Sequence, residues 1–456
     1  MKKWNLAVGL LAAVALASCG GGGGGGGLGG IAATVPKPAL TTTVKINGQA
    51  ATAQSADQYA VKPGDTVEIT PSQSVSWTSS SSPVGISANA LASTPSQWSA
   101  QLVNETSAPA TYTVTASAGA AAANTKSLQF VVAGGDSRNG SYKAFATNGT
   151  RQTLALNFDT STYTWTDSNN VVLTGSFAAD ANEAGTYVFQ SARITTVANT
   201  ARFHLNQDTV VGAFPFVVTQ STTETYAIQP FVASRALETQ QAALDGVYNR
   251  FGIDVGPSAQ SSDISQFQIS GGGTTLVRCN DGNISRIELC PPASLQTWQI
   301  SPGSVSGMWT MVDTASPSNT ANIALARIGN QRIFLIAGKS LSDPHTTVFR
   351  IGVPESTAWP AGTGYGTATP GSWGRVQVAA NNTSTRSGVA TDGSAVQTFN
   401  TFYSMAPSQP NGMRLLPNTS TGATYFTMQG ANIFAIVGAN DPSHGTNGYL
   451  QISLMD

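Results

Sequence analysis

One short sequence occurs twice in the second half of the chain, and this repeat limits the folds open to it. The segment RIFLIAGKSLSDPH at 332–345 returns as ANIFAIVGANDPSH at 431–444. In both copies an apolar run containing Ile-Phe-x-Ile-x-Gly ends at a turn with Asp-Pro and a following His. A short apolar run stopped by turn residues predicts a buried strand. Self-similarity at a fixed spacing predicts a fold built of repeated modules.

A second pair of matching segments extends the repeat toward the N-terminus. The segment GSYKAF at 140–145 matches GVYNRF at 246–251, with Asn139 and Asp245 as the turn residues before them. Runs of β-branched and aromatic residues follow both copies and predict antiparallel β meanders. The chain is also long enough for three or four domains of about 100–150 residues.

We therefore expect an all-β fold with three related antiparallel modules at 136–235, 245–355 and 362–456. Each would be a barrel or a sandwich of seven or eight strands, because such a unit needs about one period of chain. A single β-propeller of roughly six or seven blades is the alternative, with two four-stranded blades in each period.

One helix is predicted between the first two modules. It runs from Arg235 to Leu244, with Ser234 as its N-cap and Gly246 just beyond its end. The helix either connects the modules or plugs one end of a barrel.

The N-terminus predicts an exported protein. Lys2 and Lys3 precede an apolar run at 6–16, the pattern of a signal peptide at 1–18. Leu16-Ala17-Ser18-Cys19 resembles the lipobox of bacterial outer-membrane-type lipoproteins. The resemblance implies cleavage before Cys19, acylation of Cys19 and anchoring to a membrane. Gly20, where inner-membrane lipoproteins carry Asp, implies an outer-membrane lipoprotein that faces the periplasm or the cell surface. A Gly-rich tether at 19–40 follows.

The segment 41–133 predicts a β-sandwich. It has short alternating runs separated by turns such as Val61-Lys62-Pro63-Gly64-Asp65. That turn, together with the run ATYTVT at 110–115, resembles the immunoglobulin-like domains of bacterial surface proteins. The resemblance implies an immunoglobulin-like sandwich without the cysteine pair of antibody domains.

The composition argues against a nucleic-acid partner. Charged residues make up 10% of the chain and the net charge is -1, whereas soluble domains carry about 25% charged residues. We find no basic patch of the kind that binds nucleic acid.

Cys279 and Cys290 flank the turn-rich segment 280–283. In an oxidising compartment two cysteines this close predict a disulfide that closes a hairpin. No His lies near them to complete a metal site, so we predict no metal and no cofactor.

The repeated turns carry two of the three histidines. Asp343 and His345, and equally Asp441 and His444, form either a pair of metal-binding or proton-transfer sites or simple Asx-turns, and we favour the turns. No motif of a known enzyme class is present, so we predict no catalytic residue. Scattered carboxylates leave a polysaccharide hydrolase or lyase as an alternative: Glu238, Asp245, Glu288, Asp313 and Glu355.

Tryptophans are the remaining candidates. Alternation with apolar neighbours places Trp165 and Trp309 in cores. Trp359, Tyr365 and Trp373 lie in and around the Gly-rich segment 362–366, which we interpret as an exposed loop. Exposed aromatic side chains on a neutral β surface can hold sugar rings, so this is the candidate binding face.

Together these features predict a lipid-anchored cell-envelope protein with a binding or structural role, such as adhesion or capture of a glycan or protein. Two alternatives stay open, a polysaccharide-active enzyme and an accessory subunit of an envelope assembly.

Overall fold

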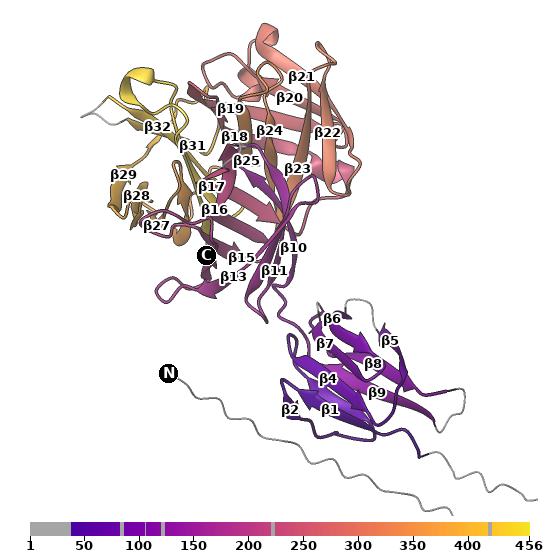
Figure 1. The fold of residues 1–456 in the computed structure, drawn as a ribbon. Helices are drawn as coiled ribbons and strands as arrows, with labels where there is room; N and C mark the ends of the chain where they lie inside the picture. The colour runs from indigo at the N-terminus through magenta and orange to yellow at the C-terminus, as the bar shows by residue number, and fades with distance from the viewer. Residues whose placement is uncertain (1–37, 83–85, 105, 120–123, 220–223, 418–421) are drawn as a thin grey trace, which may run out of the picture.

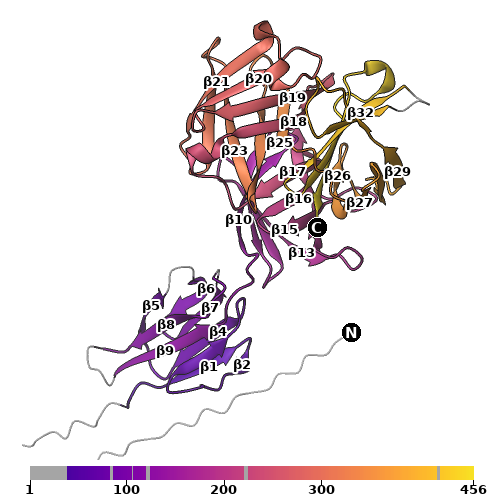
Figure 2. The same cartoon turned by 180° about the vertical axis from the view of Figure 1, so that it is seen from behind.

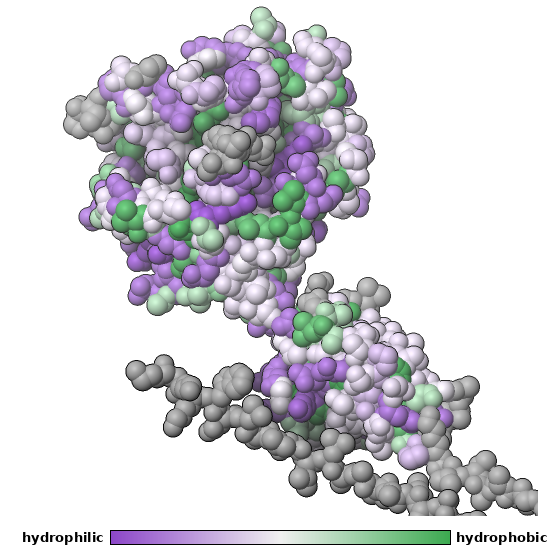
Figure 3. All heavy atoms as spheres, in the orientation of Figure 1, coloured by the Kyte–Doolittle hydropathy of each residue, from purple (hydrophilic) through white to green (hydrophobic). Residues whose placement is uncertain are grey.

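The structure is a computed structural model that describes residues 38–82, 86–104, 106–119, 124–219, 224–417 and 422–456. The predicted signal peptide, Cys19 and nearly all of the Gly-rich tether lie outside these residues. The fold is all-β, with a sandwich followed by three β modules that pack together (Figures 1 and 2). Polar residues cover most of the surface in Figure 3, with apolar residues in separate patches.

The N-terminal unit is the expected immunoglobulin-like sandwich. Its two sheets have the strand orders β2-β1-β4-β7-β6 and β3-β9-β8-β5, and β3 runs parallel to β9. At the predicted turn Gly64 takes a φ of 88° and Asp65 donates its N–H to the carbonyl of Lys62. The strands are β1 (Thr42–Ile46), β2 (Gln49–Ala50), β3 (Gln58–Val61), β4 (Thr66–Pro71), β5 (Ser76–Ser82), β6 (Ile86–Thr94), β7 (Gln97–Asn104), β8 (Ala110–Ser117) and β9 (Thr125–Val132).

The next eight strands form a closed up-and-down barrel, which we call barrel 1. Pairing of the first strand with the last closes it, with Ala144 opposite Ala233. Trp165 is buried in its interior, as predicted. The strands are β10 (Gly140–Ala146), β11 (Arg151–Asn157), β12 (Thr162–Thr166), β13 (Val172–Ala179), β14 (Thr186–Gln190), β15 (Arg202–Asn206), β16 (Thr209–Thr219) and β17 (Thr225–Ser234).

A second closed barrel of eight strands follows, which we call barrel 2. Its first and last strands pair from Tyr248 opposite Pro354 to Val255 opposite Thr347. Trp309 is buried in its interior. The strands are β18 (Gly246–Val255), β19 (Gln260–Ser270), β20 (Thr275–Cys279), β21 (Leu295–Pro302), β22 (Met308–Asp313), β23 (Thr320–Ile328), β24 (Gln331–Lys339) and β25 (Thr347–Pro354).

The third module has the same meander but is open at one point. Its first strand again pairs with its last, while no pairing joins β29 to β30. Only the buried residue Phe402 separates β29 from β30, so the two act as one bent strand that pairs first with β28 and then with β31. The strands are β26 (Gly362–Ala368), β27 (Ser372–Ala379), β28 (Thr383–Val389), β29 (Ala395–Thr401), β30 (Tyr403–Ser404), β31 (Met413–Pro417), β32 (Thr424–Gly430), β33 (Ile433–Gly438) and β34 (Leu450–Met455).

The two copies of the repeat form the equivalent strands β24 and β33, and both are buried on both faces. In β24, Phe334 and Ile336 point into barrel 2, whereas Leu335 joins an apolar cluster shared by the three modules. In β33, Phe434 packs inside the third module and Ile433 joins the shared cluster. A strand with two buried faces needs apolar residues at consecutive positions. This confirms the predicted buried strand and explains its unbroken apolar run.

The preferred prediction of barrels is confirmed, whereas the propeller alternative and the predicted helix are wrong. The modules are barrels and not blades of a propeller, because each meander pairs its first strand with its last. The helix at 235–244 does not form either. Strand β17 extends through Ser234, Leu237 makes a bridge with Ala326 in β23, and only a 3-10 turn at Gln241–Leu244 remains. Backbone hydrogen bonds to β23 replace those of a helix, and Leu244 lies in the interior of barrel 2.

The helical elements of the described residues between 241 and 444 are 3-10 turns of three or four residues. No helix within the described part of the chain is long and apolar enough to cross a membrane.

Candidate functional site

The predicted aromatic binding face is buried. The segment 362–366 is strand β26 and not a loop, and a Cβ added at Gly366 would lie 2.0 Å from the carbonyl oxygen of Ile452 in β34. The glycines therefore allow two strands to approach closely. Trp373 is 1% exposed, and its Nε1 donates a hydrogen bond to Glu183 of barrel 1 (2.8 Å). Tyr365 is also buried and packs against His204 of barrel 1.

Trp359 is half-buried and belongs to the interior of the third module. Its ring packs edge-on against Phe402 and Phe434. The guanidinium of Arg414 lies 3.9 Å from the ring centroid and covers its face. Trp359, Tyr365 and Trp373 thus take part in packing within and between modules, and they do not form a shared surface for a sugar.

The repeated turns hold themselves together. The carboxylate of Asp343 accepts hydrogen bonds from the backbone N–H of His345 (3.0 Å) and the hydroxyl of Thr346 (2.6 Å). The carboxylate of Asp441 accepts the backbone N–H of Ser443 (3.0 Å) and also bonds to the His444 ring. These are the hydrogen bonds of Asx-turns. Among the described residues, no group of three His, Cys, Asp or Glu could hold a metal ion.

The five scattered carboxylates each have a local partner, and none of them lines either of the two pockets described below. Glu238 pairs with Arg332, and Glu288 pairs with Arg286. Asp245 accepts backbone N–H groups of the turn at 272–273, and Asp313 accepts the backbone N–H of Ala315. Glu355 accepts a hydrogen bond from Gln266 (3.1 Å).

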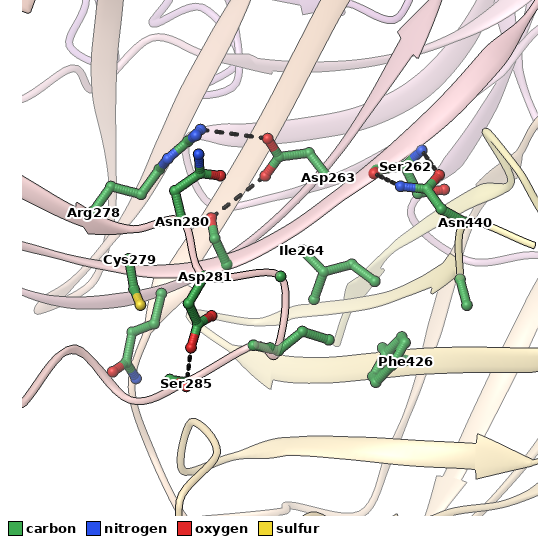
Figure 4. Close-up of a pocket in the computed structure, with 15 residues that line it drawn as sticks. Ser262, Asp263, Ile264, Arg278, Cys279, Asn280, Asp281, Ser285, Phe426 and Asn440 are labelled. Atoms are coloured by element: carbon green, nitrogen blue, oxygen red, sulfur yellow. Dashed lines mark hydrogen bonds and ion pairs between the residues drawn. The ribbon is translucent and has the colours of Figure 1, made fainter. Parts of the chain in front are cut away.

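A pocket of about 410 Å³ lies where barrel 2 meets the third module, and we call it the seam pocket. Side chains reach it from β19, from the loop at 280–285 and from the third module (Figure 4). Phe426 forms an apolar wall and the other side is mostly polar. The lining residues are Ser262, Asp263, Ile264, Ser265, Gln266, Arg278, Cys279, Asn280, Asp281, Gly282, Ile284, Ser285, Phe426, Ala439 and Asn440.

The pocket exists because strand β19 is longer than its neighbour β20. β20 pairs only with the part of β19 from Phe267 to Ser270, so the part from Gln260 to Gln266 has no strand of barrel 2 on that edge. At Ser262 the side chain of Asn440 takes the place of a strand, accepting the backbone N–H (2.6 Å) and donating to the carbonyl (2.5 Å). These bonds join the third module to the edge of barrel 2.

The loop that forms the outer wall is fixed at several points. The predicted disulfide is confirmed, since Cys279 and Cys290 are bonded. The side-chain oxygen of Gln266 accepts the backbone N–H of Ile287 (2.8 Å), and the Asp281 carboxylate bonds to Ser285 within the loop. A pocket wall fixed in this way loses less conformational entropy when a ligand binds.

The charged floor of the pocket is a cluster of arginines around one carboxylate. Asp263 accepts two hydrogen bonds from Arg250 (2.7 and 2.9 Å) and lies 3.5 Å from Arg278 and 3.4 Å from Arg350. Arg350 also pairs with Asp254 (2.7 Å). The side chain of Arg250 is 5% exposed and that of Asp263 is 20% exposed. Ionised groups this far from water need partners, and here the partners are each other.

The two lining carboxylates are held ionised. Burial alone would raise the pKa of Asp263, but the charges of Arg250, Arg350 and Arg278 together hold it far below its usual value. Burial also opposes ionisation of Asp281, but hydrogen bonds led by the one from Ser285 lower its pKa. Burial lowers the pKa of Arg250 to about 10, which leaves it protonated at neutral pH. Neither carboxylate can therefore supply a proton at neutral pH.

These residues were not predicted from the sequence, although one signal was present. In β19, Asp263 has the same alternation phase as Phe267 and Ile269, which point into barrel 2. Arg250 is likewise two residues from Tyr248, which also points inward. A charged residue at an inward-facing position of a strand marks a buried polar cluster. Which residues of the alternating pattern face inward can be assigned only when the strand boundaries are known.

The comparisons with known proteins leave this chain without a named family. No family model matches the chain, and no curated protein does. One similar solved structure is a DUF4784 family protein from Bacteroides caccae, with 10% identity, a TM-score of 0.19 and coverage of 79% of this chain and 96% of that one. Another is the surface layer protein SbsC, domains 1–6, with 10% identity, a TM-score of 0.12 and coverage of 83% of this chain and 63% of that one.

Proposed function

We propose that the protein is a lipid-anchored component of the cell envelope that binds a glycan in the seam pocket without changing it. The single observation that carries the proposal is the composition of this pocket. It combines one aromatic wall, Phe426, with amide, hydroxyl and charged side chains in a space of about 410 Å³. Sugars are recognised by contact with an aromatic ring together with several hydrogen bonds to polar side chains.

One lining side chain is free to bind a ligand. The amide of Asn280 is exposed at the pocket and has no hydrogen-bond partner within the described residues. The neighbouring polar groups of Asp263, Asp281 and Asn440 already bond to the protein and so are held in fixed positions. Fixed polar groups around a free amide favour selective binding of a polar ligand.

The same geometry argues against sugar hydrolysis at this site. Glycosidases generally need one carboxylic acid that keeps its proton and one carboxylate. The pKa values of both lining carboxylates, Asp263 and Asp281, are lowered. The proposed role is therefore capture, and the lipid anchor and outer-membrane location implied by the lipobox resemblance remain part of the proposal.

The test is a glycan-binding screen with the full-length protein in detergent, followed by mass analysis of every bound ligand. We expect at least one glycan to bind and to be recovered intact. Asn280→Ala should weaken that binding about three- to tenfold, the effect of losing one or two neutral hydrogen bonds. Asn283→Ala is the matched control, because Asn283 is exposed in the same loop but does not line the pocket. A ligand recovered in fragments would support the hydrolase or lyase instead, and equal binding by both variants would remove the pocket from the proposal.

A further inference from the structure

A second, larger cleft lies between barrel 1 and barrel 2, away from the seam pocket. Its volume is about 770 Å³, within the range of about 300–1,000 Å³ typical of ligand sites. The residues from barrel 1 belong mainly to β10, β11, β12 and β16, and those from barrel 2 include Met308, Asn322 and Lys339. The two clefts share no lining residue.

The inner wall of this cleft is aromatic. Trp165, Phe214 and Phe216 line it, and all three belong to the interior cluster of barrel 1. The Trp165 ring centroid lies 5.0 Å from that of Phe214 and 5.2 Å from that of Phe216, so their faces and edges are fixed by packing. The three rings are 1–2% exposed, so a ligand in the cleft touches this wall over a small area.

Trp165 carries a polar atom that the protein leaves without a partner. The residue is 2% exposed, and its Nε1 has no hydrogen-bond acceptor among the described residues. In contrast, Trp309 and Trp373 are equally buried and donate to Glu238 and Glu183. A buried N–H without an acceptor costs about 1–3 kcal/mol, so a ligand acceptor that reached this atom would recover that free energy.

The rim of the cleft has an excess of positive charge. Lys143, Arg151, Arg193 and Lys339 line it together with two carboxylates, Asp167 and Glu224. Both carboxylates are occupied: Asp167 accepts backbone N–H groups of its own turn, and Glu224 bonds to Tyr226 and lies 3.9 Å from Arg193.

Three of the four cations have no carboxylate partner within ion-pair distance in the described part of the chain. These are Lys143, Arg151 and Lys339. In a chain of net charge -1, an aromatic cleft with unpaired cations at its rim is complementary to an organic anion.

We propose that this cleft binds a small aromatic carboxylate. The ring of the ligand packs against Trp165 and the two phenylalanines, and an oxygen at its inner end accepts the hydrogen bond from Trp165 Nε1. The carboxylate lies at the rim, where Arg151 and Lys339 balance its charge. This proposal does not depend on glycan binding at the seam pocket, and each can fail alone.

Three related probes separate the contributions, measured by calorimetry with full-length protein and a detergent-only blank. 6-Hydroxy-2-naphthoate has the ring, the acceptor and the acid, 2-naphthoate lacks the acceptor, and 2-naphthol lacks the acid. We expect 6-hydroxy-2-naphthoate to bind at one site, about fivefold tighter than 2-naphthoate because of one hydrogen bond. 2-Naphthol should bind more weakly than 6-hydroxy-2-naphthoate.

Two variants assign these differences to residues. Trp165→Phe should abolish the difference in affinity between 6-hydroxy-2-naphthoate and 2-naphthoate. Arg151→Gln should weaken the binding of both carboxylate probes about threefold or more and leave the binding of 2-naphthol unchanged. Trp309→Phe and Arg327→Gln are matched controls outside the cleft, and both should leave all three probes unchanged.

Three results would contradict the proposal. It is overturned if 6-hydroxy-2-naphthoate does not bind, if 2-naphthol binds as tightly as the carboxylates, or if both cleft variants bind all probes like the wild type. Thermal unfolding checks that Trp165→Phe folds. If it does not fold, Arg151→Gln decides the question, because Arg151 is exposed and its replacement leaves the core unchanged.

Discussion

Barrel 1 and barrel 2 have the same number of strands in the same order, but their interiors are different. Half of the buried cluster inside barrel 1 is aromatic, including Tyr163, Phe189 and Phe214, which contact one another edge to face. Barrel 2 has an apolar interior at one end and the Asp263 cluster of arginines at the other. Both barrels close, so closure requires matched strands and does not require a particular interior chemistry.

The difference also separates the two candidate sites. The cleft beside barrel 1 has an aromatic wall because the interior of that barrel is aromatic. The seam pocket has a charged floor because its barrel carries charges at inward-facing positions. We expect the two regions to respond differently to mutation, to reduction and to acid, and four experiments test this.

The largest effect is expected in barrel 1. Phe189 is fully buried and its ring lies 4.7 Å from Phe203 and 5.0 Å from Phe214. Phe189→Ala should lower the free energy of unfolding by about 3–5 kcal/mol, because the packed rings leave a cavity that the barrel cannot close. Urea denaturation measures this. Phe399→Ala is the control, since Phe399 is 68% exposed and should change stability by less than about 0.5 kcal/mol. Equal losses in both variants would contradict a rigid aromatic core.

In barrel 2 the comparable change is the removal of one charge. Asp263→Ala should cost about 3 kcal/mol, since it leaves Arg250 charged and buried without its carboxylate. The double variant with Arg250→Met and Asp263→Leu should cost less than the single one, because an apolar pair replaces the ion pair. The same urea measurement compares them. A double variant no more stable than Asp263→Ala would mean that the cluster is required as a whole, with Arg278 and Arg350 included.

Loss of the disulfide should weaken ligand binding in the seam pocket and leave ligand binding in the cleft unchanged. The Cys279–Cys290 disulfide closes a loop with a sequence separation of 11, which contributes about 2–3 kcal/mol in the loop-entropy view. The variant with both cysteines changed to Ser should unfold at a lower temperature and bind the glycan of the seam pocket more weakly. Binding of 6-hydroxy-2-naphthoate in the cleft is the internal control. A reductant should change neither the unfolding temperature nor the glycan binding of the double variant. A change there would mean that the reductant acts on something other than this disulfide.

The smallest effects are expected on acidification, in two separate pH ranges. Burial lowers the pKa of His204, which hydrogen-bonds to Thr186 and Asp456 at the contact between barrel 1 and the C-terminus. The unfolded chain therefore takes up this proton first, and the stability from His204 is lost as the pH falls below about 6.5. The pKa of Asp263 is also lowered, and because Asp263 is an acid, its stabilisation is present above about pH 4 and is lost below it.

Thermal unfolding between pH 7 and pH 3 measures both losses. His204→Gln should remove the first loss and keep the second. If the curve of this variant followed the wild type between pH 7 and pH 5, His204 would not be the group that titrates.

The sequence predicted the large features of this fold well and the sites poorly. The repeat at 332–345 and 431–444 indicated buried strands in repeated modules, and the structure has them in equivalent positions as β24 and β33. The spacing of Cys279 and Cys290 was enough to predict their disulfide. These are local signals, and local signals remain readable without knowledge of neighbouring strands.

Predictions failed where a distant strand decided the outcome. The Gly-rich segment at 362–366 has the composition of a loop, yet it is a strand whose glycines allow the backbone of β34 to approach. Trp373 was expected to be exposed, but barrel 1 covers it. The helix predicted at 235–244 had a good cap and good propensity, yet its backbone pairs with β23. Tertiary contacts outweigh local propensity because each local preference is worth less than about 1 kcal/mol.

The sequence by itself determined that the chain forms β modules, since the period of apolar residues and the turn residues between them are written into each segment. Only the tertiary structure decided that the modules close as barrels, that the third opens between β29 and β30, and that Asp263 meets three arginines. The reason is physical. Strand closure and buried charge pairing depend on which residues meet across the sheet, and that depends on the register of strands far apart in the chain.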